Sequence, residues 1–207
     1  MRLPVLLSGL LLAACSVIGV RSGTEEPRFE SVGRNGAVEI RRYGPRLAAE
    51  TTVAAGSETA ARSEGFRRLA GYIFGGNRSA ASIPMTAPVA QTSEKIAMTA
   101  PVATTAAGAG SWRVQFFMPA SATRESLPLP NDPTVRIIEV PGETVAVLRY
   151  AGIANAEVAA RQRAALLTAL ATGPWRAAGA PFDWFYDPPW TVPGLRRNEA
   201  VVVVAPQ

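Results

Sequence analysis

The sequence predicts an α+β fold in which two similar halves form a distorted pseudo-barrel with two long helices. Each half shows the same order of predicted elements, which is strand, strand, helix, strand, strand. The first half starts at Val38 and the second at Val135. Strand pairs separated by one helix are typical of antiparallel or mixed sheets with helices packed on one side. Closing two such halves into a barrel would also remove exposed sheet edges.

Turn and capping residues mark the elements of the first half. Ser57 is the predicted N-cap of the first helix, Glu58 lies in its first turn, and Gly75-Gly76 ends it. The sequence Tyr43-Gly44-Pro45 is a turn signal between the first two strands. Beyond the helix, one segment alternates in the way that a half-buried strand does. The predicted strands of this half are residues 38–42, 47–53 and 111–118.

The second half repeats these signals. Asn155 is the predicted N-cap of the second helix, which runs through Leu170 to Gly173-Pro174. Pro141-Gly142 separates the first two strands, and the proline-rich residues 127–133 connect the halves. The predicted strands are residues 135–140, 144–150, 182–186 and 200–204.

A shorter repeat lies inside the first half. Ile83-Pro84-Met85-Thr86-Ala87-Pro88-Val89 returns as Ile96-Ala97-Met98-Thr99-Ala100-Pro101-Val102. Each copy is apolar and ends near a proline, which predicts a short extended segment at a sheet edge. The polar residues between the copies are enough for a hairpin loop. Two interpretations stay open: duplicated strands, or one wall of an apolar pocket with its two methionines as soft contacts.

Composition excludes several function classes. The chain has 207 residues, a formal net charge of +5, one cysteine and no histidine. Without histidine there is no Ser-His or Cys-His catalysis and no histidine-based zinc or iron site. The single cysteine excludes an intramolecular disulfide. Basic residues occur in runs of two at most, so no nucleic-acid partner is predicted.

The N-terminal residues have the pattern of a secretory targeting signal. Met1-Arg2 precedes the apolar residues 3–14, and Leu12-Ala13-Ala14-Cys15 resembles a bacterial lipobox. We therefore expect a signal peptide over residues 1–14, lipidation of Cys15, a tether over 15–34 and the folded domain over 35–207. Ser16 favours sorting to the outer membrane, with the domain facing the periplasm. The alternatives are an uncleaved anchor over residues 3–20 and an ordinary cleaved signal.

Four motifs stand in a characteristic order along the domain. They are Val38-Glu39-Ile40-Arg41-Arg42-Tyr43, Gly71-Tyr72-Ile73-Phe74-Gly75-Gly76-Asn77, the paired Met-Thr-Ala-Pro-Val segments, and Tyr186-Asp187-Pro188-Pro189-Trp190 with Arg196-Arg197-Asn198-Glu199. Over about residues 36 to 204 the chain thereby resembles the SOUL heme-binding protein family. The resemblance implies a duplicated α+β pseudo-barrel. It also implies binding of heme or another tetrapyrrole on an apolar surface beside the first helix.

The resemblance directs attention to one set of candidate ligand-binding residues. An arginine suits the ligand's propionates, and the remaining side chains suit its apolar face. Some family members ligate iron through histidine, which this chain lacks, so the axial ligand stays unassigned, with methionine or tyrosine as options. The helical spacing of three members is also that of a core stripe, which stays open. The set is Arg62, Phe66, Leu69, Ile73, Met85 and Met98.

Two other functions remain as alternatives to a tetrapyrrole carrier. One is an envelope module with a structural role or a small apolar ligand. The other is a tetrapyrrole-modifying enzyme, for which the candidate acid and base residues would be carboxylates. Their spacing does not distinguish them from surface residues, so no catalytic residue and no enzyme activity is predicted. These carboxylates are Glu39, Glu50, Asp183 and Asp187.

Overall fold

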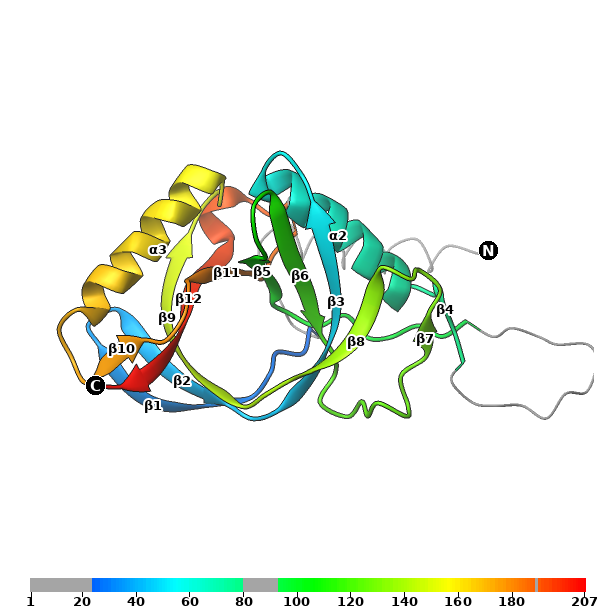
Figure 1. Cartoon of the computed structure of the whole chain (residues 1–207), viewed down its shortest axis with the longest axis horizontal. Coiled ribbons are helices and arrows are strands. Elements are labelled where there is room, and N and C mark those ends of the chain that lie inside the picture. The colour runs from blue at the N-terminus through cyan, green and yellow to red at the C-terminus, as the bar shows by residue number, and fades with distance from the viewer. Residues whose placement is uncertain (1–23, 80–92, 189) are drawn as a thin grey trace, which may run out of the picture.

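The two halves of the chain share one curled antiparallel sheet, and each half places one helix on its outer face (Figure 1). The computed structural model describes residues 24–79, 93–188 and 190–207. Met85 and Cys15, and with them the predicted signal peptide and the first copy of the short repeat, lie outside the described residues. The α+β pseudo-barrel with two long helices is confirmed.

Each half contains the predicted order of elements. In the first half these are β2 (Val38–Tyr43), β3 (Arg46–Ala54), α2 (Glu58–Ile73), β5 (Val102–Ala106) and β6 (Ser111–Phe117). In the second half they are β8 (Val135–Val140), β9 (Glu143–Ala151), α3 (Ala156–Leu170), β11 (Phe182–Phe185) and β12 (Arg197–Pro206). The additional elements are β1 (Phe29–Asn35), β4 (Asn77–Arg78), β7 (Leu129–Pro130), β10 (Trp175–Ala177) and the 3-10 helix η1 (Pro193–Leu195).

The strand order shows that the halves exchange their first strands. The sheet runs β1-β2-β9-β12-β11-β5-β6-β3-β8, and β10 pairs with β12. β5 and β11 pair at the centre, while β2 joins the second half and β8 joins the first. The strands on either side of each predicted turn therefore do not pair with each other. Each of these strands pairs with a strand of the other half, so the two halves form one continuous sheet.

The sheet bends where two prolines interrupt it. β2 and β3 run antiparallel to β9 and β8, and pairing stops on both sides at the same level, at Gly44-Pro45 and Pro141-Gly142. Proline cannot donate to a strand ladder, so neither side can continue the pairing there. A Cβ atom on Gly142 would lie 3.2 Å from the Tyr43 carbonyl oxygen. Glycine at this position lets the two bends come close together.

Both helix starts are confirmed by their caps. The Ser57 hydroxyl accepts a hydrogen bond from the Ala60 N–H at 3.2 Å. The side-chain Oδ1 of Asn155 accepts one from the Val158 N–H at 2.8 Å. Such caps satisfy donors that the first helical turn leaves unpaired. α2 ends at Ile73, and Gly75 adopts a φ of +114°, which favours glycine.

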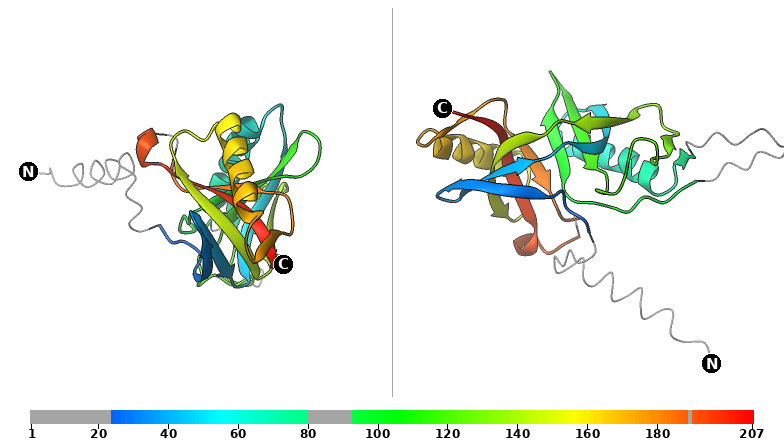
Figure 2. Two further views of the ribbon diagram at one scale, coloured as in Figure 1. Left: turned by 90° about the vertical axis from the view of Figure 1, so that its left-hand side faces the viewer. Right: turned by 90° about the horizontal axis from the view of Figure 1, so that it is seen from below.

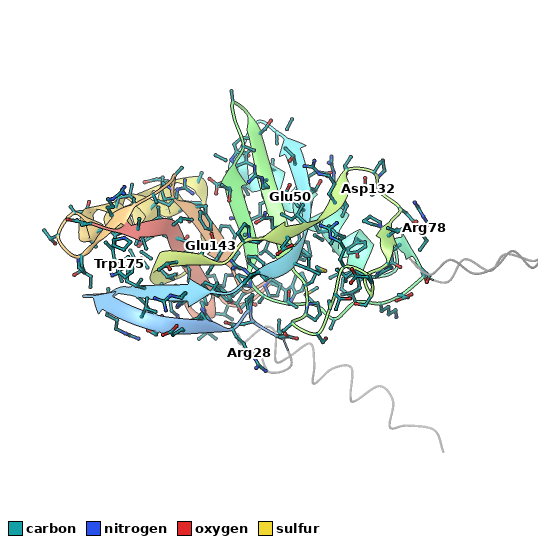
Figure 3. The ribbon with its side chains drawn as sticks, turned by 60° about the horizontal axis from the view of Figure 1, so that its bottom comes forward. Arg28, Glu50, Arg78, Asp132, Glu143 and Trp175 are labelled. Carbon is teal, nitrogen blue, oxygen red and sulfur yellow. The ribbon has the colours of Figure 1, made fainter. Side chains whose placement is uncertain are left out.

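Three apolar clusters fill the molecule. One lines the inner face of the sheet around Trp184, Phe117 and Val201. The second lies between α2 and the sheet, and the third lies between α3 and the sheet. Consecutive residues of β12 illustrate the division: Val201 faces inward, and Val202 faces α3. The pair β4 and β7 forms a separate small sheet at the end of the molecule where Arg78 lies (Figure 3).

A network of charges is buried on the inner face. The Glu199 side chain has no exposed surface. Its carboxylate accepts two hydrogen bonds from Arg41, at 2.9 and 3.2 Å, and two from Arg197, at 3.0 and 2.8 Å. The Tyr186 hydroxyl adds a fifth at 2.6 Å. This carboxylate therefore joins β2, β12 and the end of β11.

The structure differs from the expected tether. Phe29–Asn35, which we expect to lie almost entirely in a tether, forms strand β1 and pairs with β2. Its residues are mostly exposed, so the sequence carries no buried periodicity there. The preceding residues 24–28, here called the strap, also contact the sheet through Glu25 and Glu26. The second copy of the short repeat forms a strand only from Val102 onward.

Candidate functional site

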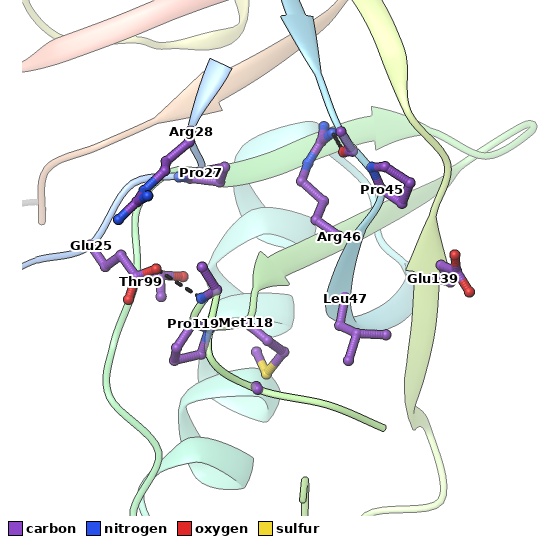
Figure 4. A pocket seen from close by; sticks show the side chains of 13 residues that line it. Glu25, Pro27, Arg28, Pro45, Arg46, Leu47, Thr99, Met118, Pro119 and Glu139 are labelled. Carbon is purple, nitrogen blue, oxygen red and sulfur yellow. Dashed lines mark hydrogen bonds between the residues drawn. The ribbon is translucent and has the colours of Figure 1, made fainter. Parts of the chain in front are cut away.

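A cavity of about 420 Å³ opens beside the bend between β2 and β3 (Figure 4). This volume falls within the range of small-molecule pockets, roughly 300–1,000 Å³. Apolar groups form much of its wall, among them Leu47 and Met118, and Figure 4 shows the Met118 sulfur beside Leu47. The charged residues of the wall are Glu25, Arg28, Arg46 and Glu139. The cavity therefore suits a ligand with an apolar body and charged or polar ends.

The two arginines of the cavity differ in how firmly protein contacts hold their guanidinium groups. Arg46 donates to the Glu143 carboxylate at 2.6 Å, and its guanidinium stacks between the rings of Tyr43 and Phe117 at 4.7 and 4.6 Å. It is held in place by the sheet. Arg28 belongs to the strap and is exposed. Arg28 is thus the cation that a ligand at this cavity can reach most readily.

The strap closes one side of the cavity and is fixed to the second Met-Thr-Ala-Pro-Val copy. The Glu25 carbonyl oxygen accepts a hydrogen bond from the Ala100 N–H at 2.9 Å, and its carboxylate accepts one from the Ala120 N–H at 2.8 Å. Thr99 pairs with Glu25 and donates its hydroxyl to the Phe117 carbonyl oxygen. Thr99 also lines the cavity. This copy of the repeat therefore contributes to a pocket wall through Thr99.

The predicted ligand-binding residues lie elsewhere. Leu69 and Ile73 are buried in the cluster between α2 and the sheet, so they act as core residues. Phe66 is half-buried and packs on Phe116 with ring centroids 5.3 Å apart. Met98 is 40% exposed. None of these four lines the cavity beside Leu47 and Met118, although Met98 directly precedes Thr99.

Arg62 is held by protein contacts. Its guanidinium stacks on the Phe185 ring at 4.0 Å and donates to the Ala154 carbonyl oxygen at 3.2 Å. Burial lowers the pKa of Arg62 below its ordinary value. Arg62 thus connects α2 with β11 and with the connection between β9 and α3.

A second, smaller cavity of about 240 Å³ lies between the helices, with Glu58, Thr104 and Arg163 in its wall. Arg163 of α3 contacts Glu58 of α2 at 3.4 Å and forms an ion pair with the fully buried Asp183. Burial raises the pKa of Asp183 to about 6, against the opposing effect of Arg163. Within the described ranges, one Asp183 carboxylate oxygen and the Thr104 hydroxyl lack hydrogen-bond partners. Helices α2 and α3 are therefore joined through a buried polar cluster in which some hydrogen-bonding groups lack partners.

The carboxylates considered as acid and base candidates all have protein partners. Glu39 accepts from Arg41 at 2.8 Å, and Glu50 accepts from Gln115 at 2.8 Å. Asp187 accepts from the Arg197 N–H at 2.7 Å. No group of three or more metal-ligating side chains occurs in the part of the chain that the structure describes. None of its helices is long and apolar enough to cross a bilayer.

Two α+β halves that share one curled sheet define a duplicated α+β fold, and comparison with known proteins gives the family. A family model described as SOUL heme-binding protein matches residues 24–203. The chain therefore belongs to the SOUL heme-binding protein family, and this membership supports heme binding in general. No curated protein matches the sequence at a significant level.

Solved structures share the fold at low sequence identity. The crystal structure of the EcmrR C-terminal domain has a TM-score of 0.54 and 10% identity, covering 86% of this chain and 98% of that one. A crystal structure of a hydrolase from Listeria innocua has a TM-score of 0.53 and 10% identity, covering 84% of this chain and 94% of that one. At such identities the likeness concerns the fold alone.

Sequence reasoning missed the residues that build the larger cavity. Arg28 stood in the expected tether, and Leu47 and Met118 stood in predicted strands with no sign that they lie close together. Their shared wall depends on the bend in the sheet and on the position of the strap. Two sequence signals lie near the cavity: the Gly-Pro pair at residues 44–45, which marks the bend, and the second copy of the short repeat, which lines the cavity through Thr99.

Proposed function

We propose that this protein binds heme or a related tetrapyrrole at the bacterial envelope, by apolar contact and charge pairing and without a histidine ligand. One observation carries the proposal. In a chain of this family that lacks histidine, a cavity of about 420 Å³ combines an apolar wall with two arginines. The protein acts in this proposal as a carrier or buffer of the ligand.

The cavity offers the two kinds of contact that a tetrapyrrole needs. Leu47, Met118 and Pro119 present apolar surface to a flat macrocycle, whose burial contributes roughly 25 cal/mol per Å² before the costs of association. Arg28 is placed to pair with a propionate, because charge-assisted hydrogen bonds from arginine to carboxylate are strong. Heme supplies the iron and its macrocycle, while these residues supply binding and orientation.

The helix face remains the competing location for the same ligand. Met98 is exposed, and Phe66 is partly accessible on α2. Leu69 and Ile73 could contact a ligand there only after repacking of the core. The cavity requires no such rearrangement, and for this reason we favour it.

Titration with hemin and with metal-free protoporphyrin tests the function. Equal affinity for both indicates capture by apolar contact and charge, whereas preference for hemin indicates iron ligation, for which Met98 and Met118 are the thioethers among the described residues. No saturable binding of either compound would reject the proposal and leave an envelope module with another role.

Charge reversals locate the site. Arg28→Glu should weaken binding about tenfold or more, since it replaces a charge-assisted hydrogen bond with repulsion. Arg34→Glu is the matched control, because Arg34 is exposed on β1 and does not line the cavity. Met98→Asp tests the helix face. If Met98→Asp abolishes binding and Arg28→Glu leaves it unchanged, the cavity is not the site.

The envelope location is tested separately. Labelled fatty acid should be incorporated into the wild-type chain and lost in Cys15→Ser. Label that persists in Cys15→Ser would rule out the lipid anchor without affecting the binding proposal.

A further inference from the structure

An exposed apolar patch lies on the connection between β11 and β12. Trp190 is 62% exposed there, and Val192 and Leu195 are also exposed. Ile153, on the connection between β9 and α3, is exposed too, and Asn198 donates to the neighbouring Gly152 carbonyl oxygen at 3.0 Å. These four residues, Ile153, Trp190, Val192 and Leu195, are called the loop patch below. Exposed apolar side chains grouped in this way mark interaction surfaces.

The backbone that presents the loop patch is held by its own hydrogen bonds. The buried Thr191 donates its N–H to the Pro188 carbonyl oxygen at 3.1 Å and accepts at its own carbonyl from Arg196 Nε at 2.7 Å. The Leu195 N–H donates to the Val192 carbonyl oxygen at 2.9 Å. The exposed apolar side chains are therefore carried by backbone that these hydrogen bonds hold in place. This arrangement presents them for contact.

The loop patch lies beside the point where the N-terminal part of the chain joins the domain. The Glu26 carboxylate of the strap pairs with Arg197 at 3.1 Å, and Arg197 directly follows the loop. Both views in Figure 2 place η1 on the same side of the molecule as the strap. The nine residues Ser16 to Thr24 span at most about 30 Å at roughly 3.4 Å each. A lipid on Cys15 would thus hold the loop patch close to the membrane.

We infer that the loop patch is a docking surface for the lipid bilayer, an inference that rests on the proposed lipid anchor at Cys15. Tryptophan prefers the interface between headgroups and acyl chains, where its ring is apolar and its N–H stays hydrated. The neighbouring aliphatic side chains add apolar area that favours burial in the same layer. The position of the patch beside the strap favours a bilayer over a protein partner.

Docking would also place the larger cavity near the membrane. Glu25, Pro27 and Arg28 of the strap line that cavity, while Glu26 pairs with Arg197 beside the loop patch. An apolar ligand dissolved in the bilayer would then have a short route into the cavity. The loop patch thereby sets the orientation in which the protein exchanges its ligand.

The test uses the full chain with its anchor, reconstituted into phosphatidylcholine–phosphatidylglycerol vesicles with brominated acyl chains. Bromine quenches tryptophan fluorescence at close range, and the chain has four tryptophans. We expect quenching in the wild type and loss of most of it in Trp190→Phe. Trp175→Phe is the matched control, since Trp175 packs with the cluster under α3 and lies apart from Arg28 of the strap (Figure 3). Val192→Ser with Leu195→Ser should reduce quenching while keeping Trp190.

The outcomes separate docking from anchoring. A chain that stays with the vesicles but shows equal quenching in the wild type and in Trp190→Phe, or none in either, overturns the docking surface and keeps the anchor. A chain that washes off the vesicles overturns the anchor and the docking surface with it. Hemin titration of the same variants reports on the binding function independently.

Discussion

Two acids are buried completely among the described residues, and their surroundings are opposite. Glu199, on the inner face of the sheet, accepts hydrogen bonds from two guanidinium groups and a tyrosine hydroxyl. Asp183, on the outer side between the helices, pairs with Arg163, which also contacts Glu58. One oxygen of Asp183 has no hydrogen-bond partner among the described residues.

The difference shows that burial alone does not determine what a charge does for the fold. Removing a carboxylate from water is costly, and the cost is offset only when hydrogen bonds and opposite charges surround it. Around Glu199 this condition is met, so the group ties three strands together. Around Asp183 this condition is only partly met. The contact between α2 and α3 is therefore less strongly stabilised than the strands joined by Glu199.

Removal of the Glu199 carboxylate is expected to have the largest effect. Glu199→Ala leaves the guanidinium groups of Arg41 and Arg197 buried without their main partner. A loss of about 3–5 kcal/mol in the free energy of unfolding is expected for breaking such a buried pair. Urea denaturation followed by circular dichroism measures it.

Glu50→Ala is the matched control for this prediction. Glu50 is also buried, but its arginine partners Arg113 and Arg136 reach solvent, so they can be rehydrated when the carboxylate is removed. We expect a loss of about 1 kcal/mol, that of an ordinary hydrogen bond. Equal losses for Glu199→Ala and Glu50→Ala would show that the saturated network has no special role.

The pH dependence of stability tests the other acid. The pKa of Asp183 in the folded protein is about 6, raised by burial, whereas an unfolded aspartate titrates near 3.9. Between these values the folded state binds more protons. The contribution of Asp183 is therefore fully present below about pH 4 and is lost as the pH rises through about 6. The loss is on the order of 3 kcal/mol, at about 1.4 kcal/mol per pH unit.

Asp183→Asn isolates this contribution. The variant cannot titrate at this position, so its free energy of unfolding should fall less than that of the wild type between pH 4 and 7. Urea denaturation of both proteins at several pH values gives the difference. Parallel curves for the two proteins would mean that Arg163 keeps Asp183 ionised and that the polar groups around Asp183 are better satisfied than their hydrogen bonds suggest.

Local signals in the sequence predicted most of the fold. Ser57 and Asn155 cap the two helices as expected, because an N-cap depends on neighbouring residues only. β1 was missed because its side chains are mostly exposed and its one partner is β2. The pairing of β2 with β9 joins residues about a hundred positions apart, and periodicity carries no information on such partners.

The candidate site was less predictable for the same reason. The spacing of Leu69 and Ile73 correctly indicated one face of a helix, but spacing cannot tell whether a face meets the sheet or a ligand. The cavity takes residues from five separate parts of the chain, around Arg28, Leu47, Thr99, Met118 and Glu139. The bend at Gly44-Pro45 and Pro141-Gly142 and the position of the strap bring them together.

A matched pair of tyrosines gives the smallest and most selective test of the comparison. The Tyr186 hydroxyl donates to Glu199 at 2.6 Å, whereas the Tyr150 hydroxyl, near Asp183, is buried without a hydrogen-bond partner in the described part of the chain. Tyr186→Phe should cost about 2 kcal/mol, because it removes a hydrogen bond to a charged group. Tyr150→Phe should cost little or even stabilise, because it removes an unsatisfied hydroxyl. If thermal unfolding shows the same loss for both, the two acids are held alike, and the contrast between Glu199 on the inner face and Asp183 between the helices does not hold.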